Sequence, residues 1–113
     1  MIVSPDIRRL SAGATRTIRV GLDQALETGT ALTLTSITEA TGVLTLGSKA
    51  INTAEFTTDQ NGETVTIAVG QGAEFSCAIG TGAVGVVYTV RILATTDDSV
   101  AQTIEYGQRV TFV

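Results

Sequence analysis

Residues 77–92 read CAIGTGAVGVVYTVRI, and this stretch decides between two fold classes. Gly80, Gly82 and Gly85 give it the spacing G-x-G-x-x-G, which dinucleotide-binding proteins place between a strand and a helix. The residues that follow Gly85 are Val-Val-Tyr-Thr-Val-Arg-Ile, a β-branched run with alternating apolar positions. Such a run favours a strand, and it offers no N-cap residue at which a helix begins. The glycines therefore predict a turn between two strands, and no cofactor is expected.

The same alternation recurs along the chain and predicts an all-β fold. Runs such as ALTLTS at 31–36 and VVYTVRIL at 86–93 place apolar residues at every second position, as half-buried strands do. Turn signals separate these runs: Asn61-Gly62 predicts a hairpin, and Gly107 predicts a bulge in the last strand. We expect strands at 15–20, 31–38, 43–46, 49–57, 63–69, 73–79, 85–95 and 100–112.

The length and the strand pattern together predict the domain organisation. Roughly seven or eight short strands separated by turns are typical of an Ig-like antiparallel β-sandwich. The chain has 113 residues, the size of one domain. We assign the sandwich to residues 15–113. Residues 1–14 hold Pro5 and show no alternation, so they are expected to form an N-terminal arm.

Charge and composition exclude several classes of function. Seven basic and eleven acidic residues give a net charge of −4, which argues against a nucleic-acid partner. The only basic cluster is Arg8, Arg9, Arg16 and Arg19, expected to be solvated or to face another subunit. The chain has no histidine, so it holds neither a Ser-His-Asp triad nor a histidine metal site. We expect no enzyme activity, no bound metal and no small-molecule substrate.

The single cysteine and the apolar runs bear on compartment. Cys77 lies in the alternating pattern Phe75-x-Cys77-x-Ile79 and is expected to be a small buried hydrophobe. The N-terminal residues show no secretory signal, and no apolar run approaches the roughly 20 residues that span a bilayer. We therefore expect synthesis in a cytoplasm and no membrane partner.

Several motifs follow one another in a recognisable order. They are L-E-T-G-T-A-L at 26–32, G-V-V-Y-T-V at 85–90, A-T-T-D at 94–97, and a last strand ending R-V-T-F at 109–112. In this order they resemble the phage fiber-tail adaptor family of small Ig-like virion proteins. The resemblance implies a non-enzymatic virion component, repeated in a homo-oligomeric ring, that joins a fiber or tail part to the portal or tail. It also implies a location in the virion after synthesis in the host cytoplasm.

Two other functions stay open. A capsid decoration protein uses the same kind of fold and arm, and it would bind capsid proteins in place of portal, tail or fiber proteins. An Ig-like module that binds a host surface or carbohydrate needs exposed aromatic residues. The five aromatic residues here sit at core-like positions of alternating strands, which makes that function the weaker alternative.

Two regions are candidate partner-binding sites. The arm is expected to dock on a neighbour as an added strand or hook, through Ile2, Val3, Ile7, Arg8 and Leu10. The glycine turn is expected to allow close packing at a ring seam, through Gly80, Gly82 and Gly85. Deletion of residues 1–10 is expected to abolish incorporation into particles and to leave the domain folded. No catalytic, cofactor-binding or metal-binding residue is predicted.

Overall fold

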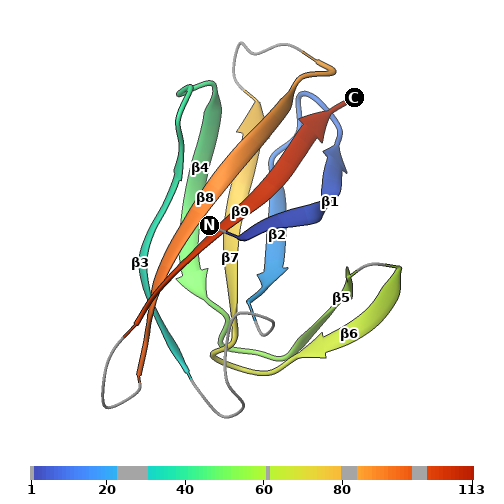
Figure 1. Cartoon of the computed structure of the whole chain (residues 1–113). Coiled ribbons are helices and arrows are strands. Elements are labelled where there is room, and N and C mark those ends of the chain that lie inside the picture. The colour runs from blue at the N-terminus through green and yellow to red at the C-terminus, as the bar shows by residue number, and fades with distance from the viewer. Residues whose placement is uncertain (1, 23–30, 61, 80–83, 98–101) are drawn as a thin grey trace.

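Two β-sheets packed face to face form the body of the protein (Figure 1). The computed structural model describes residues 2–22, 31–60, 62–79, 84–97 and 102–113. Those ranges contain strands and no helix, so the predicted all-β class is confirmed. The strands are β1 (Ile2–Leu10), β2 (Arg16–Gly21), β3 (Leu32–Glu39), β4 (Leu44–Ile51), β5 (Phe56–Gln60), β6 (Glu63–Ile67), β7 (Gly72–Ile79), β8 (Val87–Thr96) and β9 (Thr103–Phe112).

The strand order is that of an Ig-like sandwich. One sheet has the order β1-β9-β8-β3, and the other has the order β2-β7-β4. These orders match the G-F-C and B-E-D strands of an Ig domain, with β1 added in parallel beside the last strand. The β5–β6 hairpin forms a separate two-stranded sheet between β4 and β7 in the chain. Seven strands therefore form the sandwich and two form the hairpin, among the residues described.

Alternate residues of the strands fill the space between the sheets. In β8, Val90 and Ile92 are fully buried, whereas Arg91 between them is exposed. Phe75 of β7 and Phe112 of β9 are also fully buried and reach the same core from opposite sheets. The period-2 runs of β-branched and aromatic residues thus become the inward faces of two sheets, where burial of apolar surface stabilises the fold.

The strand pattern around residue 48 differs from the prediction. The sequence predicted two strands, at 43–46 and 49–57, whereas the structure has one strand, β4, that ends before Asn52. Ser48 has a φ of 48°, and the pairing of β4 with β7 shifts between Gly47 and Ala50. These features define a β-bulge, which bends the strand without ending it. A glycine and a serine that looked like a turn therefore lie inside a continuous strand.

The hairpin predicted at Asn61-Gly62 is confirmed by the strands on either side. β5 and β6 pair antiparallel, with Gln60 opposite Glu63. Gly62 has a φ of +80°, the left-handed conformation that tight hairpin turns require. Asn61 itself lies outside the described residues.

The bulge predicted at Gly107 is wrong. β8 and β9 pair without a shift in register, and Arg91 lies directly opposite Gly107. The irregularity is on the other side of β9, where the pairing of β1 shifts between Val3 and Ile7. The extra residues belong to β1, so β9 itself stays continuous.

The N-terminal segment is a strand where the sequence predicted an arm over residues 1–14. Residues 2–10 form β1, which pairs in parallel with β9 of the same chain. The shift between Val3 and Ile7 surrounds Pro5, whose missing N–H is tolerated at an edge strand or bulge. This interruption breaks the period-2 pattern on which the sequence prediction of strands depends, so the strand was not visible in the sequence.

A pair of glycines seats the hairpin on the three-stranded sheet. Gly21 of β2 and Gly72 of β7 lie opposite each other in the ladder. A Cβ on Gly72 would lie 2.8 Å from the Phe56 ring and 2.9 Å from the Val20 carbonyl oxygen. A Cβ on Gly21 would lie 2.5 Å from the Cδ1 atom of Ile67. Glycine at both positions therefore lets Phe56 of β5 and Ile67 of β6 pack against the backbone of the sheet.

We expect Gly72→Ala to destabilise the protein by about 2 kcal/mol, because the added methyl overlaps an aromatic ring and a backbone oxygen that cannot both move freely. Urea denaturation followed by fluorescence or circular dichroism measures this change. Gly47→Ala is the matched control, since the nearest atom to its Cβ is the Ser76 hydroxyl at 3.0 Å. Equal unfolding midpoints for the two variants would contradict the seating of the hairpin on this glycine pair.

Candidate functional site

The sandwich is closed along one side and open along the other. On the closed side, β3 and β4 of the two sheets contact each other. On the other side, β1 and β2 are edge strands of different sheets, and the β5–β6 hairpin projects beside them (Figure 1). Edge strands present backbone groups that another polypeptide can pair with. We call this side the open corner, defined by β1, β2 and the hairpin.

A groove of about 760 Å³ lies in the open corner. Its volume is in the range of sites that hold a small molecule or a short peptide segment. Three elements line it, through residues 8–10 of β1, residues 17–19 of β2, and residues 56–59 with Thr64 of the hairpin. We call it the arginine groove, because Arg8, Arg9 and Arg19 are among these residues.

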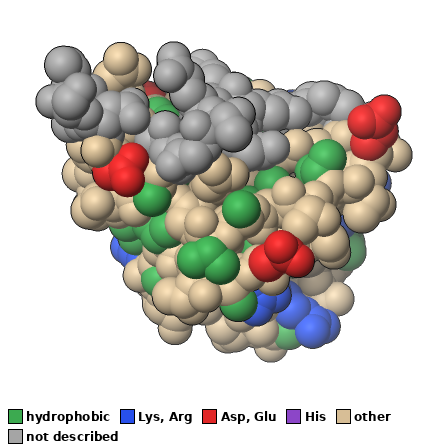
Figure 2. Space-filling view, turned by 90° about the horizontal axis from the view of Figure 1, so that it is seen from below, with side chains coloured by type: hydrophobic (Ala, Val, Ile, Leu, Met, Phe, Trp, Pro, Cys, Tyr) green, Lys and Arg blue, Asp and Glu red, His purple; other side chains and the backbone are tan. Residues whose placement is uncertain are grey.

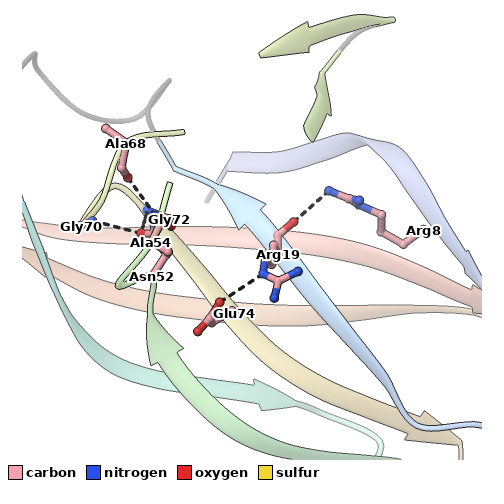
Figure 3. Close-up of polar contacts among 8 residues, drawn as sticks. All are labelled: Arg8, Arg19, Asn52, Ala54, Ala68, Gly70, Gly72 and Glu74. Atoms are coloured by element: carbon pink, nitrogen blue, oxygen red, sulfur yellow. Dashed lines mark hydrogen bonds and ion pairs between the residues drawn. The ribbon is translucent and has the colours of Figure 1, made fainter. Parts of the chain in front are cut away.

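The Arg8 side chain ties the three walls of the groove together. Its Nη2 donates a hydrogen bond to the backbone oxygen of Arg19 on β2 at 3.0 Å (Figure 3). The same nitrogen donates to Thr58 Oγ1 on β5 at 2.7 Å, and Thr58 is buried. A charged donor makes stronger hydrogen bonds than a neutral one. Arg8 therefore holds the hairpin and β2 at a fixed separation from β1.

The other two arginines are exposed but differ from Arg8 in direction or pairing, because neighbouring residues of a strand alternate between faces and Arg9 pairs opposite Thr111 whereas Arg8 pairs opposite the core residue Val110. Arg19 forms an ion pair with Glu74 on the neighbouring strand β7, with 3.3 Å between Nε and Oε2 (Figure 3). The Arg19 side chain is 54% exposed, and such surface pairs are weak. Arg9 is exposed and has no hydrogen-bond or ion-pair partner among the described residues. One carboxylate, Asp59, lines the groove, and it accepts a hydrogen bond from Thr64.

The expected docking residues lie on β1 and not on a free arm. The side chain of Val3 is 44% exposed, Ile7 is half-buried, and Leu10 packs against the core. Arg8 enters the groove, and the backbone of Ile2 pairs opposite Tyr106. The segment thus adds a strand as expected, but to its own chain, because β9 offers it a free edge. Contact of these residues with another protein stays a prediction.

The glycine turn lies largely outside the described residues, since Gly80 and Gly82 are not among them. Gly85 is described: it has a φ of +87° and its N–H donates to the Phe112 oxygen at 2.9 Å. A Cβ at Gly85 would meet no atom within 4 Å. Glycine is therefore favoured there by the left-handed backbone, and not by close packing within the chain. Packing at a seam between copies stays a prediction.

Sequence reasoning missed Thr17, Arg19 and the hairpin residues as parts of one site. The arginine cluster was visible in the sequence, but it was interpreted only as solvated or subunit-facing. Arg8 and Arg9 are on β1 and Arg19 is on β2, in different sheets, so no single strand pattern brings them together. Arg16 belongs to the cluster in sequence and does not line the groove.

The described part of the lower end of the molecule has no comparable concentration of one kind of side chain. Figure 2 shows hydrophobic, acidic and basic side chains interspersed among other residues at the described part of this end. Single exposed hydrophobic residues are normal on a protein surface. The candidate site is therefore sought at the open corner, where described side chains line a groove.

Cys77 lies in the core and is not positioned for chemistry. It is fully buried in β7, as the alternating pattern predicted. Burial, with a smaller contribution from the negative charge of Glu39, raises the pKa of the Cys77 thiol to about 11. The thiolate is the nucleophilic form, so this raised pKa keeps the sulfur unreactive near neutral pH. The described residues hold no group of three or more acidic or cysteine side chains close enough to bind a metal ion.

We expect iodoacetamide to alkylate native Cys77 at pH 8 at least roughly a hundredfold more slowly than the urea-unfolded chain, because a pKa raised by burial lowers the thiolate fraction and the core excludes the reagent. Mass spectrometry of timed samples measures the two rates. Alkylation at equal rates would show that the thiol is accessible in the native state.

No described segment forms a helix long and apolar enough to cross a membrane. Comparisons with models of protein families, with curated proteins and with solved structures found no match to this chain. The function is therefore argued from the fold and from the open corner.

Proposed function

We propose that this protein is a non-enzymatic structural component of a tailed bacteriophage virion, which joins a fiber or tail component to the portal or tail. Its partner binds in the open corner, along the arginine groove. The protein is made in the host cytoplasm and acts in the virion, in several copies arranged in a ring.

The observation that carries the proposal is the groove between two unpaired sheet edges. A joining protein has to hold a segment of another polypeptide, and edge strands beside a groove are a common way to do so. Arg8 spans the groove to Arg19 and Thr58, so the site is held in shape before any partner arrives. A preorganised site loses less conformational freedom on binding than a mobile one.

The motifs that resemble the fiber-tail adaptor family also support the proposal by their place in the fold. The G-x-x-Y-x-V motif runs into β8, with Tyr88 and Val90 buried. The A-T-T-D motif ends β8, and the R-V-T-F motif ends β9. Three of the four motifs therefore lie on two paired strands of the four-stranded sheet and on the segments at their ends, and the L-E-T-G-T-A-L motif at 26–32 lies largely outside the described residues.

Cryo-electron microscopy of the intact particle tests the proposal. We expect a ring or rosette of this domain at the portal vertex, in contact with fiber bases. Density spread over the capsid lattice would instead make the protein a capsid decoration protein. Absence of the chain from purified particles, shown by mass spectrometry, would overturn a role in the virion altogether.

A further inference from the structure

We propose that Arg8 is an edge guard: its side chain closes the outer edge of β2 and prevents this strand from pairing with β2 of a second copy of the chain. This inference goes beyond the proposed function, because it concerns contact between copies and not the partner that the protein joins. Three observations carry it: the direction of the β2 backbone groups, the position of the Arg8 guanidinium, and the order of residues 17–19.

Two residues in the middle of β2 turn their backbone groups away from β7. The Leu22 N–H donates to the oxygen of Gln71, which extends the β2–β7 ladder by one position. Because bonded positions alternate along an antiparallel ladder, Thr17 and Arg19 direct their N–H and C=O groups outward. Such outward groups form an unpaired sheet edge, which another chain can use as a template for pairing.

The Arg8 guanidinium lies across this edge. Arg8 belongs to β1, in the other sheet, and its Nη2 donates to the outward Arg19 oxygen at 3.0 Å (Figure 3). The same Nη2 donates to Thr58 Oγ1 of the hairpin at 2.7 Å, and Thr58 is 8% exposed. The guanidinium is therefore fixed between β2 and the hairpin, and the Arg19 oxygen already has a donor when another strand approaches.

The hairpin covers β2 at the next outward position, which is Gly21. A Cβ there would lie 2.7 Å from Gln60 Nε2 and 2.5 Å from Ile67 Cδ1. Thr17 and Arg19 line the groove instead, so this part of the edge is closed by Arg8 and not by the hairpin. Natural proteins use charged side chains at sheet edges to prevent edge-to-edge association.

A second copy fits the edge of β2 because residues 17–19 are self-complementary. An antiparallel pairing centred on Ile18 places Thr17 of each copy opposite Arg19 of the other copy. Both members of each pair direct their backbone groups outward, so each pair can exchange two hydrogen bonds. The arginines lie opposite threonines, which avoids direct repulsion between like charges. In each pair one bond needs the Arg19 oxygen, and Arg8 occupies that oxygen.

Sedimentation velocity of the full chain tests the inference. Arg8→Met keeps an apolar stem and removes the donors, and we expect it to form dimers with an association constant at least about tenfold above that of the wild type. Amide hydrogen exchange followed by NMR locates the contact. As the concentration of Arg8→Met rises, we expect the Thr17 and Arg19 amides to exchange at least about tenfold more slowly, because they become paired.

Three further variants separate the guard from a general loss of stability. Thr58→Val removes the other acceptor of Arg8 and leaves the bond to Arg19, so we expect no added association. Thr17→Pro in the Arg8→Met background removes an outward N–H, which an edge strand tolerates, and is expected to reverse the association. Arg8→Gln has a shorter side chain that cannot reach both acceptors, and it is measured in parallel so that the test does not depend on the folding of one variant.

Several results would overturn the inference. They are association of folded Arg8→Met and Arg8→Gln no stronger than that of the wild type, equal association of Thr58→Val, and association that persists with Thr17→Pro or leaves the Thr17 and Arg19 amides unprotected.

The outcome is separable from that of the proposed function, because the guard closes β2 and leaves the edge of β1 free for a partner. If Arg8→Met does not associate but the protein lies at the portal vertex, the guard is wrong and the joining role stands. If Arg8→Met pairs through β2 but the chain is absent from particles, the guard stands and the virion role is wrong.

Discussion

Asn52→Ala is expected to destabilise the protein by about 3 kcal/mol, because one buried side chain satisfies four backbone groups. Its Nδ2 donates to the oxygens of Ala54 at 3.0 Å and Ala68 at 2.9 Å (Figure 3). Its Oδ1 accepts from the N–H groups of Gly70 at 3.1 Å and Gly72 at 2.9 Å. Asn52 is 2% exposed, so water cannot readily replace the amide.

The expected loss in the free energy of unfolding depends on whether the backbone groups that bond to the Asn52 amide find other partners in the Asn52→Ala variant. Alanine removes four hydrogen bonds and leaves the buried Gly72 N–H without this acceptor, whereas Gly70 N–H keeps the Asn52 backbone oxygen and the Ala68 oxygen keeps the Gln71 N–H. An unpaired buried group costs about 1–3 kcal/mol, less where water enters. Urea denaturation gives the free energy of unfolding. Thr53→Ala is the control, because Thr53 is exposed and adjacent in the chain. A loss below about 1 kcal/mol would show that the segment around residues 68–72 is held mainly by its own backbone bonds.

The parts of the fold that follow from local pattern could be predicted from the sequence. Period-2 runs gave the strands near β2, β3, β7, β8 and β9 within a few residues, because each buries one face against the opposite sheet. The hairpin was predicted from Asn61-Gly62, because a two-residue hairpin turn needs positive φ angles, which asparagine and glycine tolerate. Cys77 was correctly predicted to be buried because its neighbours at every second position are apolar.

The parts that depend on distant partners could not be predicted. Asn52 looks like an ordinary turn residue, and its role comes from partners up to 20 residues away. β1 is a parallel edge strand with an interruption around Pro5, so no alternation marks it. The groove needs β1, β2 and the hairpin at one corner, and only the topology places them there. The arginine cluster alone therefore did not identify a binding site.

Deletion of residues 1–10 is expected to destabilise the protein by at least about 3 kcal/mol, contrary to the expectation from sequence that the domain stays folded. The deletion removes the pairing of β1 with β9 and the contact of Leu10 with the core. It also removes the Arg8 bonds to Arg19 and Thr58, which leaves the buried Thr58 hydroxyl without that donor. A newly exposed β9 edge favours association of copies.

Deletion of residues 1–5 is the matched control. It keeps Ile7 to Leu10 in register with β9, and it keeps Arg8, so we expect a loss below about 1 kcal/mol. Urea denaturation measures both deletions, and size-exclusion chromatography with light scattering detects association. An unchanged midpoint for the longer deletion would show that β1 contributes no stability and would restore the interpretation of a separable arm.

The stability of the chain that lacks residues 1–10 also decides how a failure of that chain to enter particles is interpreted. If the longer deletion unfolds the domain, its absence from particles reports a folding defect and does not show that residues 1–10 contact a partner. Arg19→Gln is then the sharper probe, because it changes an exposed residue of the arginine groove and breaks only a surface ion pair. Loss of incorporation by this variant, with an unchanged free energy of unfolding, would assign the open corner to the partner directly.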